Sequence, residues 1–437
     1  MPTIVQKFGG TSVADVSKIL RCAKRALESR QSGHDVVVVV SAMGHTTDEL
    51  IDLARQIADQ PSPREMDMLM ATGEQVSIAL MSIALHTLGA DAVSMNGAQM
   101  GMRTNEVHSK ARIQSIDVDR IRKELKLGRI VVAAGFQGVT DEGEITTLGR
   151  GGSDTTAVAL AAALEVEKTG GICEIYTDVD GVYTADPRIV KNARKLERIT
   201  YEEMLELASQ GAAVMHNRSV LFGQKYDVPI HVRHSQKADQ GTIICKETAD
   251  MEDIVVAGCA LKRDLGRISL RRIPNNPGVQ GMVFDFIAKA NVIVDDIIQT
   301  QHGDLASLSF TVDHSDLADV KIAAGKALDE IGTGELAVEI GLAKVSVAGV
   351  GMRSHSGVAA AMFKALGDAG INIANITTSD IKISCIVPKQ DGERALQIVH
   401  DAFELDKPQG ARAKGESQSS GSPGGSKPGK RETARAR

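Results

Sequence analysis

The sequence predicts an αβα sandwich with a mainly parallel sheet, followed by two smaller α+β domains and a disordered tail. Up to about residue 240, apolar β-branched runs alternate with helical patterns, which is typical of a parallel sheet covered on both faces. From residue 253 the segments shorten into strand, helix, strand, strand, helix, and this order occurs twice. The last stretch, residues 406–437, is rich in Gly, Ser, Pro, Lys and Arg and has too few apolar residues to form a core.

The strands of the first part are expected at six apolar runs: Ile4–Lys7, Val36–Ser41, Ala92–Met95, Ile130–Phe136, Ile172–Thr177 and Ile230–Arg233. Two of these runs, at Val36–Val40 and Ile130–Ala134, show no alternation of apolar and polar residues. They must therefore be buried on both faces, in the centre of the sheet. Helical periodicity between the strands predicts the helices Val16–Ser29, Glu65–Leu88, Asp154–Leu164 and Tyr201–Ser209.

The two later repeats each follow a βαββα order. The first consists of Ile268–Ile273, Val279–Ala290, Val292–Gln299, Leu305–Val312 and Ser315–Ile331. The second consists of Lys344–Gly349, Val358–Ala369, Ile371–Thr377, Ile381–Pro388 and Gly392–Phe403. We therefore expect domains at residues 1–248, 253–335 and 340–405, followed by a basic tail at residues 406–437. We interpret the tail as a solvated extension; the alternative is contact with RNA or a membrane.

Composition argues against several classes of protein. The chain carries 50 Lys and Arg against 56 Asp and Glu, so it has no overall attraction for nucleic acid or anionic lipid. Aromatic residues make up only 3%, which is too few for a base-stacking surface. The five cysteines form no CxxC pair, which argues against a disulfide framework or a zinc site and favours a cytoplasmic location. No signal segment or run of 18 apolar residues indicates export or membrane spanning.

Two segments place glycines and hydroxyl residues between a strand and a helix. The first is Lys7-Phe8-Gly9-Gly10-Thr11-Ser12, and the second is Leu148-Gly149-Arg150-Gly151-Gly152-Ser153-Asp154-Thr155-Thr156. Exposed backbone N–H groups, a helix N-terminus and a cation together bind phosphate, and the Arg150 guanidinium also matches a carboxylate. Each segment can alternatively be a simple turn in which Thr11, Ser12 or Asp154 caps the next helix.

A third segment, Tyr176–Arg188, follows a strand directly and contains three aspartates, two tyrosines and an arginine. Its carboxylates are suited to nucleotide hydroxyls or to a hydrated Mg²⁺, although a structural loop is the alternative. Because all three segments follow parallel strands, they should meet at the carboxyl edge of the sheet, where open α/β sheets bind ligands. The sequence therefore predicts a phosphate-handling site at this edge.

These motifs resemble those of the aspartokinases, which have the amino-acid kinase fold. The resemblance covers residues 1–405 and is carried, in order, by KFGGTS from Lys7 and by Val36–Leu50, Ala71–Ser77, Ala133–Gly138, Thr147–Ala157 and Tyr176–Arg188, followed by two ACT-like repeats. It implies a ferredoxin-like fold for both repeats. It also implies that ATP, accompanied by Mg²⁺, phosphorylates the side-chain carboxylate of L-aspartate to give 4-phospho-L-aspartate. This is the first step towards lysine, threonine and methionine.

The resemblance also implies roles for individual residues. Lys7 and Asp154 match catalytic positions, and no protein side chain is assigned to a metal. The substrate positions are Ser41, Thr47, Glu74, Arg150 and Ser153, with Arg150 on the α-carboxylate and Glu74 on the ammonium group. The nucleotide positions are Lys7, Gly9, Gly10, Tyr176, Thr177, Asp178, Tyr183, Asp186 and Arg188. The sequence departs from the pattern at Ala213, where several relatives have a lysine that contacts the nucleotide.

The paired repeats imply feedback regulation by lysine, threonine or both, and assembly of a homo-oligomer through the ACT domains. The expected effector contacts are Asn275, Asp295, Gln299, Asn372, Thr377 and Thr378. Alternatively, one repeat only forms the subunit interface. Met251 resembles the start of a shorter regulatory subunit found in some aspartokinases.

Two other functions fit part of the sequence. The first is a kinase of the same fold that acts on glutamate, acetylglutamate or a nucleotide. The second is a non-catalytic amino-acid sensor that uses its repeats and retains an inactive kinase fold; Ala213 is the one residue that favours it.

Overall fold

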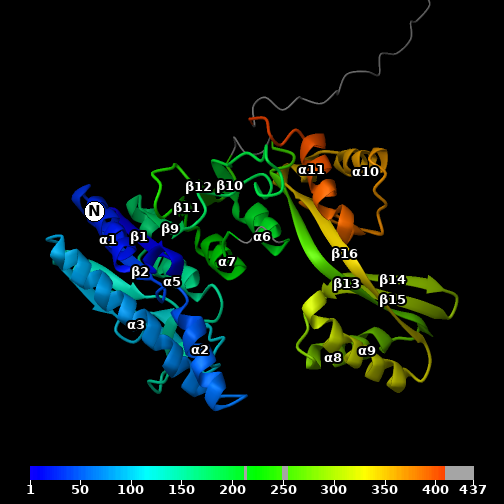
Figure 1. The fold of residues 1–437 in the computed structure, drawn as a ribbon, viewed down its shortest axis with the longest axis horizontal. Helices are drawn as coiled ribbons and strands as arrows, with labels where there is room; N and C mark the ends of the chain where they lie inside the picture. Colours follow the sequence, from blue (N-terminus) through cyan, green and yellow to red (C-terminus); the bar gives the residue numbers. More distant parts are fainter. Residues whose placement is uncertain (211–213, 249–253, 409–437) are drawn as a thin grey trace, which may run out of the picture. The chain divides into compact units, whose positions relative to one another are not determined.

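The computed structural model describes residues 1–210, 214–248 and 254–408. Ala213, Met251 and the tail beyond residue 408 lie outside the described residues, so the predictions made for them stay predictions. The structure contains an eight-stranded sheet, a four-stranded sheet and a six-stranded sheet. Figure 1 shows the helices and strands that form these layers.

The eight-stranded sheet confirms the predicted parallel core. Its order is β10-β12-β11-β9-β1-β2-β6-β3, and only the β11–β12 pair is antiparallel. The strands are β1 (Thr3–Phe8), β2 (Asp35–Val40), β3 (Ala92–Met95), β6 (Ile130–Ala134), β9 (Ile172–Thr177), β10 (Arg198–Thr200), β11 (Ile230–His234) and β12 (Thr242–Cys245). All six predicted strands are present, and the two without alternation, β2 and β6, lie next to each other inside the sheet.

Helices cover both faces of this sheet, which makes the αβα sandwich. The helices are α1 (Val16–Gln31), α2 (Thr46–Ile57), α3 (Pro63–Thr87), α4 (Asp119–Lys126), α5 (Gly152–Ala163), α6 (Tyr201–Ser209) and α7 (Asn217–Tyr226). Val36, Val38 and Val40 of β2 join the core under α1 and α3. Val37 and Val39 join the opposite core, which contains residues of α4, α5, α6 and α7. The two-residue period of the strand thus sends alternate valines to opposite layers.

Helix α3 is long and apolar enough to cross a bilayer, but 56% of its most apolar window is buried inside the protein. It is the one such helix in the part of the chain that the structure describes. Its buried residues Ile78, Met81 and Leu85 pack in the same core as β2 and β6. We therefore interpret α3 as a core helix.

The four-stranded sheet was not predicted. Its order is β5-β4-β7-β8, formed by β4 (Met102–Thr104), β5 (Ile113–Ile116), β7 (Gln137–Val139) and β8 (Ile145–Thr147). Strand β6 ends at Ala134, short of the predicted Phe136, because Phe136 takes a left-handed conformation with φ 68° and starts the turn into β7. Strand β8 leads directly into the second glycine-rich loop.

The C-terminal part forms a six-stranded antiparallel sheet with the order β14-β15-β13-β16-β18-β17. Its strands are β13 (Gly258–Pro274), β14 (Asp295–His302), β15 (Leu305–Asp313), β16 (Glu335–Ala348), β17 (Asn375–Ser379) and β18 (Lys382–Pro388). Its helices are α8 (Val279–Lys289), α9 (Leu317–Ile331), α10 (Val358–Asp368) and α11 (Gly392–Ala402). Strands β14 and β17 begin later than predicted, at residues 295 and 375 instead of 292 and 371.

The long strands β13 and β16 are shared by both repeats, as Figure 1 shows. Residues 265–274 of β13 pair with β15, whereas residues 258–262 pair with residues 344–348 of β16. Val256 and Cys259 accordingly pack in the core of the second repeat, together with α10 and α11. The first repeat has its own core under α8 and α9. The sequence assigns residues 253–262 to the first repeat, whereas the structure packs Val256 and Cys259 of this segment in the core of the second.

Candidate active site

Lys7 and Asp154 form an ion pair at the carboxyl edge of the parallel sheet. Lys7 is the penultimate residue of β1, and Asp154 lies in the first turn of α5. The Lys7 Nζ atom lies 2.5 Å from Asp154 Oδ1, and both side chains are largely buried. Asp154 therefore does not cap α5, because Gly151 occupies the N-cap position with φ 67°. The pair fixes a cationic group where a phosphate would meet the ends of β1 and β9.

The loop after β1 is held tightly against its neighbours. The Gly9 N–H donates to Tyr176 O at 3.3 Å, so this donor is already engaged. A Cβ atom on Gly10 would lie 2.8 Å from Ala42 O, so only glycine allows this approach of the loops after β1 and β2. The alternative that Thr11 or Ser12 caps α1 is wrong. Asp15 is the cap, and it accepts the Lys18 N–H at 2.9 Å.

Glu74 provides a buried carboxylate beside this loop. It extends from α3, is 3% exposed, and accepts the Ala42 N–H on Oε1 at 3.0 Å. Its other oxygen, Oε2, is buried and accepts no hydrogen bond from the residues that the structure describes. Burial raises the pKa of Glu74 from 4.5 to about 7, partly offset by the Ala42 N–H. An unsatisfied buried carboxylate oxygen of this kind is a ready acceptor for an ammonium group.

The remaining predicted substrate residues differ in exposure. Ser153 is buried in the first turn of α5 and packs against Gly135 at the end of β6, where an added Cβ would lie 2.7 Å from it. Ser41 and Thr47 are half-buried, at the end of β2 and in the first turn of α2. Arg150 is exposed and forms no hydrogen bond or ion pair with the described residues, so its guanidinium is free for a ligand.

The loop after β9 has polar side chains at its start. Thr177 donates its hydroxyl to Asp178 at 3.0 Å, and Asp178 is exposed. Tyr183 donates its hydroxyl to Asp180 at 3.0 Å, and burial raises the pKa of Tyr183 to about 12. Tyr176, another predicted nucleotide position, uses its side chain for contacts within the protein. Its ring is buried, stacks on Phe8 with centroids 4.9 Å apart, and donates its hydroxyl to Glu174.

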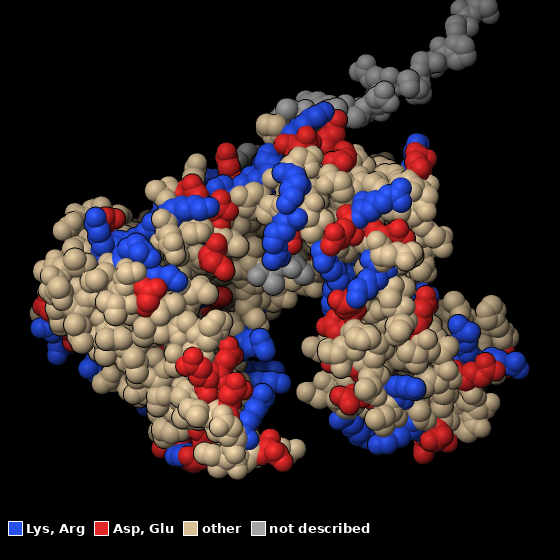
Figure 2. Space-filling model, viewed as in Figure 1, with Lys and Arg blue, Asp and Glu red and all other residues tan. Residues whose placement is uncertain are grey.

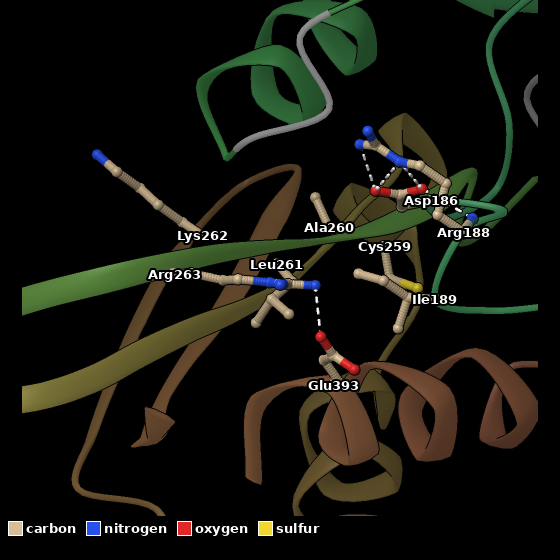
Figure 3. Close-up of a pocket in the computed structure, with 9 residues that line it drawn as sticks. All are labelled: Asp186, Arg188, Ile189, Cys259, Ala260, Leu261, Lys262, Arg263 and Glu393. Carbon is tan, nitrogen blue, oxygen red and sulfur yellow. Dashed lines mark hydrogen bonds and ion pairs between the residues drawn. The ribbon is translucent and has the colours of Figure 1, made fainter. Parts of the chain in front are cut away.

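Asp186 and Arg188 lie further along this loop and pair with each other. The Arg188 Nη2 atom lies 2.8 Å from Asp186 Oδ2, and this contact lowers the pKa of Asp186. Both residues line a cavity of about 550 Å³ whose other walls come from β13 and α11 (Figure 3). Three cations and two carboxylates line it, and Arg263 pairs with Glu393 at 2.7 Å. In the described residues, the side chains of Asp186 and Arg188 thus pair with each other and face this cavity, and neither pairs with Lys7.

The predicted effector residues form two groups. Gln299 lies between Asn275 and Gln280, at 3.4 and 2.9 Å, near the start of α8. Asp295 pairs with Lys344, and Thr377 donates to the neighbouring Asp296 at 2.9 Å, so these residues join the two repeats. Asn372 and Thr378 are exposed. Lys344 could not be recognised from the sequence, because a buried lysine inside a strand has the same place in the alternation pattern as a surface lysine. Its partner Asp296 was missed with it.

Charges on the visible face of the molecule are mixed. Figure 2 shows basic and acidic side chains interspersed over this face. This distribution agrees with the near balance of 50 basic against 56 acidic residues in the whole sequence.

Comparison with known proteins identifies the family. Residues 2–234 match the model of the amino acid kinase family, and residues 345–403 match an ACT domain. Aspartokinase 2 of Bacillus subtilis is 50% identical over 407 residues, which cover 93% of this chain and 99% of that protein. The chain belongs to the aspartokinase family.

Solved aspartokinase structures share its fold. Aspartokinase III of E. coli in complex with aspartate and ADP superposes with a TM-score of 0.74 at 28% identity, covering 92% of this chain and 99% of the other. The same E. coli enzyme in complex with lysine and aspartate gives a TM-score of 0.72 at 27% identity, with the same coverage. These similarities confirm the predicted fold, a kinase sandwich followed by ACT domains.

Proposed function

We propose that Lys7, Asp154, Glu74 and Arg150 carry the reaction of this family in the present chain. The reaction is the transfer of the γ-phosphoryl group of ATP to the side-chain carboxylate of L-aspartate. The observation that supports these roles best is the arrangement of two groups at one edge of the sheet. One is the Lys7 amine held by Asp154, and the other is the buried Glu74 oxygen without a hydrogen-bond partner.

The substrate aspartate would be held by its ammonium group and its α-carboxylate. Glu74 would accept the ammonium group, and the free Arg150 guanidinium would bind the α-carboxylate in a bidentate manner. Ser41, Thr47 and Ser153 would then supply hydroxyl contacts near the side chain. In this proposal the side-chain carboxylate would face Lys7.

Transfer itself would need no general base, because the carboxylate is already a nucleophile. One of its oxygens attacks the γ-phosphorus as the bond to the β–γ bridging oxygen breaks, and ADP leaves with the electron pair. Lys7 offsets the charge of the transferring group, and Asp154 keeps the Lys7 amine in place. A Cβ atom on Gly9 would lie 3.4 Å from Lys7 Nζ, so the loop passes beside this amine and its main-chain groups would contribute to the same contact.

Mg²⁺ belongs to this proposal as the partner of the nucleotide. The described residues contain no group of three or more His, Cys, Asp or Glu side chains that could hold a metal ion. Mg²⁺ commonly takes one or two carboxylates plus phosphate oxygens, and the exposed Asp178 would supply one such carboxylate. When bound, the ion would shield the charges of the phosphates. Thr177, Asp178 and Tyr183 are the remaining nucleotide contacts that we propose at this edge. Asp186 and Arg188 also stay proposed contacts, because the Arg188 side chain is 89% exposed although it pairs with Asp186.

We place the catalytic domain at residues 1–248 and the ACT domains in the region 254–405. Amino-acid effectors would bind near Asn275 and Gln299 and near Asp295 and Thr377, and subunits would associate through the same region. A cytoplasmic location is supported by the spacing of the five cysteines, which form no CxxC pair in the sequence. Whether a shorter subunit starts at Met251 would be seen in an immunoblot of the C-terminal region.

The proposed role of Lys7 is tested by Lys7→Ala. Aspartate-dependent ADP release should fall by about two to three orders of magnitude, as expected when one well-placed charge donor is removed. Lys18→Ala, which removes a lysine paired with Asp15 on the surface of α1, is the matched control. The assigned role is wrong if Lys7→Ala keeps more than half of the activity while its melting temperature is unchanged. Substituting glutamate for aspartate in the same assay tests the substrate.

A further inference from the structure

Two charged residues outside the predicted site hold the loop that carries Arg150. This loop consists of residues 149–151, between the end of β8 and the start of α5. Arg150 itself is exposed and contacts no described polar group, so its direction depends on what fixes the chain on either side.

Asp67 of α3 holds the end of β8, just before this loop. Its carboxylate is fully buried and accepts the Thr147 hydroxyl at 2.6 Å and the Thr147 N–H at 3.1 Å. It also accepts the Ser109 N–H at 2.9 Å and contacts His108 Nδ1 at 2.9 Å. Asp67 thus ties together the end of β8 and the loop at residues 108–109. A Cβ on Gly149 would lie 3.0 Å from Ser109 O, so these two segments touch just before Arg150.

Arg218 of α7 holds Leu148, the residue after Thr147. Its Nη1 donates to Leu148 O at 2.9 Å, and its Nη2 donates to Ala111 O at 2.8 Å. Asp67 and Arg218 therefore hold adjacent residues, Thr147 and Leu148, and both tie them to the segment at residues 108–111. On the other side of the loop, α5 starts at Gly152, where an added Cβ would lie 2.7 Å from Phe136.

We propose that Asp67 and Arg218 are positioning residues that direct Arg150 at the α-carboxylate of the substrate. Burying a carboxylate destabilises the fold unless its oxygens accept hydrogen bonds. An apolar residue at position 67 would let α3 pack at a smaller free-energy cost, so packing alone does not explain this aspartate. The hydrogen-bond donors to Asp67 are Ser109 and Thr147, which lie on the two segments that precede and contact the Arg150 loop. A misplacement of a binding group by about 1 Å is enough for large losses in binding or rate. The proposal rests on the proposed role of Arg150.

The sharpest test uses Thr147, because Thr147→Val removes one donor to Asp67 with little change of shape. We expect the KM for aspartate to rise roughly ten-fold, with the KM for ATP and kcat changing less than two-fold. Thr147→Ser keeps the hydroxyl and should return the KM towards that of the unmodified chain. Arg218→Met should act in the same direction as Thr147→Val. Thr87→Val, at an exposed threonine of α3, controls for loss of a threonine hydroxyl elsewhere.

A double-mutant cycle with Arg150→Ala separates positioning from general stability. If Asp67 and Arg218 act through Arg150, Thr147→Val and Arg218→Met should raise the KM for aspartate no further once Arg150 is alanine. Additive effects would overturn the proposal, as would equal rises in both KM values with a lower melting temperature. If Arg150→Ala alone leaves the KM unchanged, the proposed role of Arg150 has failed instead. Asp67→Asn is a further variant, and the cycle does not depend on its folding.

Discussion

Glu74 should oppose folding above neutral pH while it serves substrate binding. It is 3% exposed, and burial raises its pKa from 4.5 to about 7. A carboxyl group whose folded pKa exceeds its unfolded value binds more protons in the folded state. Its contribution to stability is therefore fully present below pH 4.5 and is lost as pH rises to about 7. Between pH 5 and pH 8 this loss amounts to about 2–3 kcal/mol.

The substitution Glu74→Gln removes the titration and keeps the size of the side chain. The stability of the variant relative to the unmodified chain should therefore increase by about 2–3 kcal/mol from pH 5 to pH 8. The burial of an unpaired amide N–H adds a cost of about 1–3 kcal/mol, but this cost is the same at both pH values. Urea unfolding without ligands measures the difference, and Glu65→Gln, at an exposed residue of the same helix, is the control.

Activity supplies the second half of the test. Because ionised Glu74 would pair with the ammonium group, the KM for aspartate should fall as pH rises through about 7. The Gln variant should show a high KM that varies little over this range. The reasoning is refuted if the stability difference between variant and unmodified chain is the same at pH 5 and pH 8. It is also refuted if the variant binds aspartate as well as the unmodified chain does.

Three further predictions concern the loop and the regulatory part. Gly151→Ala should lower the melting temperature and raise the KM for aspartate, because Gly151 has φ 67° and its new Cβ would lie 2.2 Å from the Cβ of His216. Lys344→Met should cost about 3–5 kcal/mol in urea unfolding, because it leaves the buried Asp296 without its cation. The double variant with Asp296→Asn should recover part of this loss. Glu203→Ala should raise the effector concentration for half inhibition roughly five-fold or more without changing the uninhibited KM, since Glu203 accepts a backbone N–H of the regulatory part at 3.0 Å.

The central strands could be predicted from sequence because their surroundings are uniform. Val36–Val40 is buried on both faces, and an unbroken apolar run reports that state directly. Strands of three or four residues, such as β7 (Gln137–Val139), are too short to show a period, so the four-stranded sheet was missed. The predicted strand Ile268–Ile273 is only the end of β13, since local pattern does not show that one strand serves two cores.

The residues of the candidate site also fall into those that the sequence predicts and those that it does not. Lys7 and Asp154 were predicted from glycine-rich segments, and the structure brings them together because both segments end at one sheet edge. Asp67 was missed, although an aspartate among the apolar residues of a helix that is buried along most of its length is a usable signal. Arg218 gave no such signal, since a half-buried arginine that binds backbone carbonyls resembles any surface arginine in sequence.

Because β13 belongs to both repeats, it determines the order in which they can fold during synthesis. Residues 258–262 are synthesised well before residues 344–348, which are their partners in the sheet. The sheet of the second repeat therefore cannot form until residues 344–348 have been synthesised. The first repeat can fold before the second repeat is complete. During this time the early strand has an open edge, which other chains could occupy. Any fragment that begins after β13 will lack this strand, so the regulatory half can be detached only as one piece.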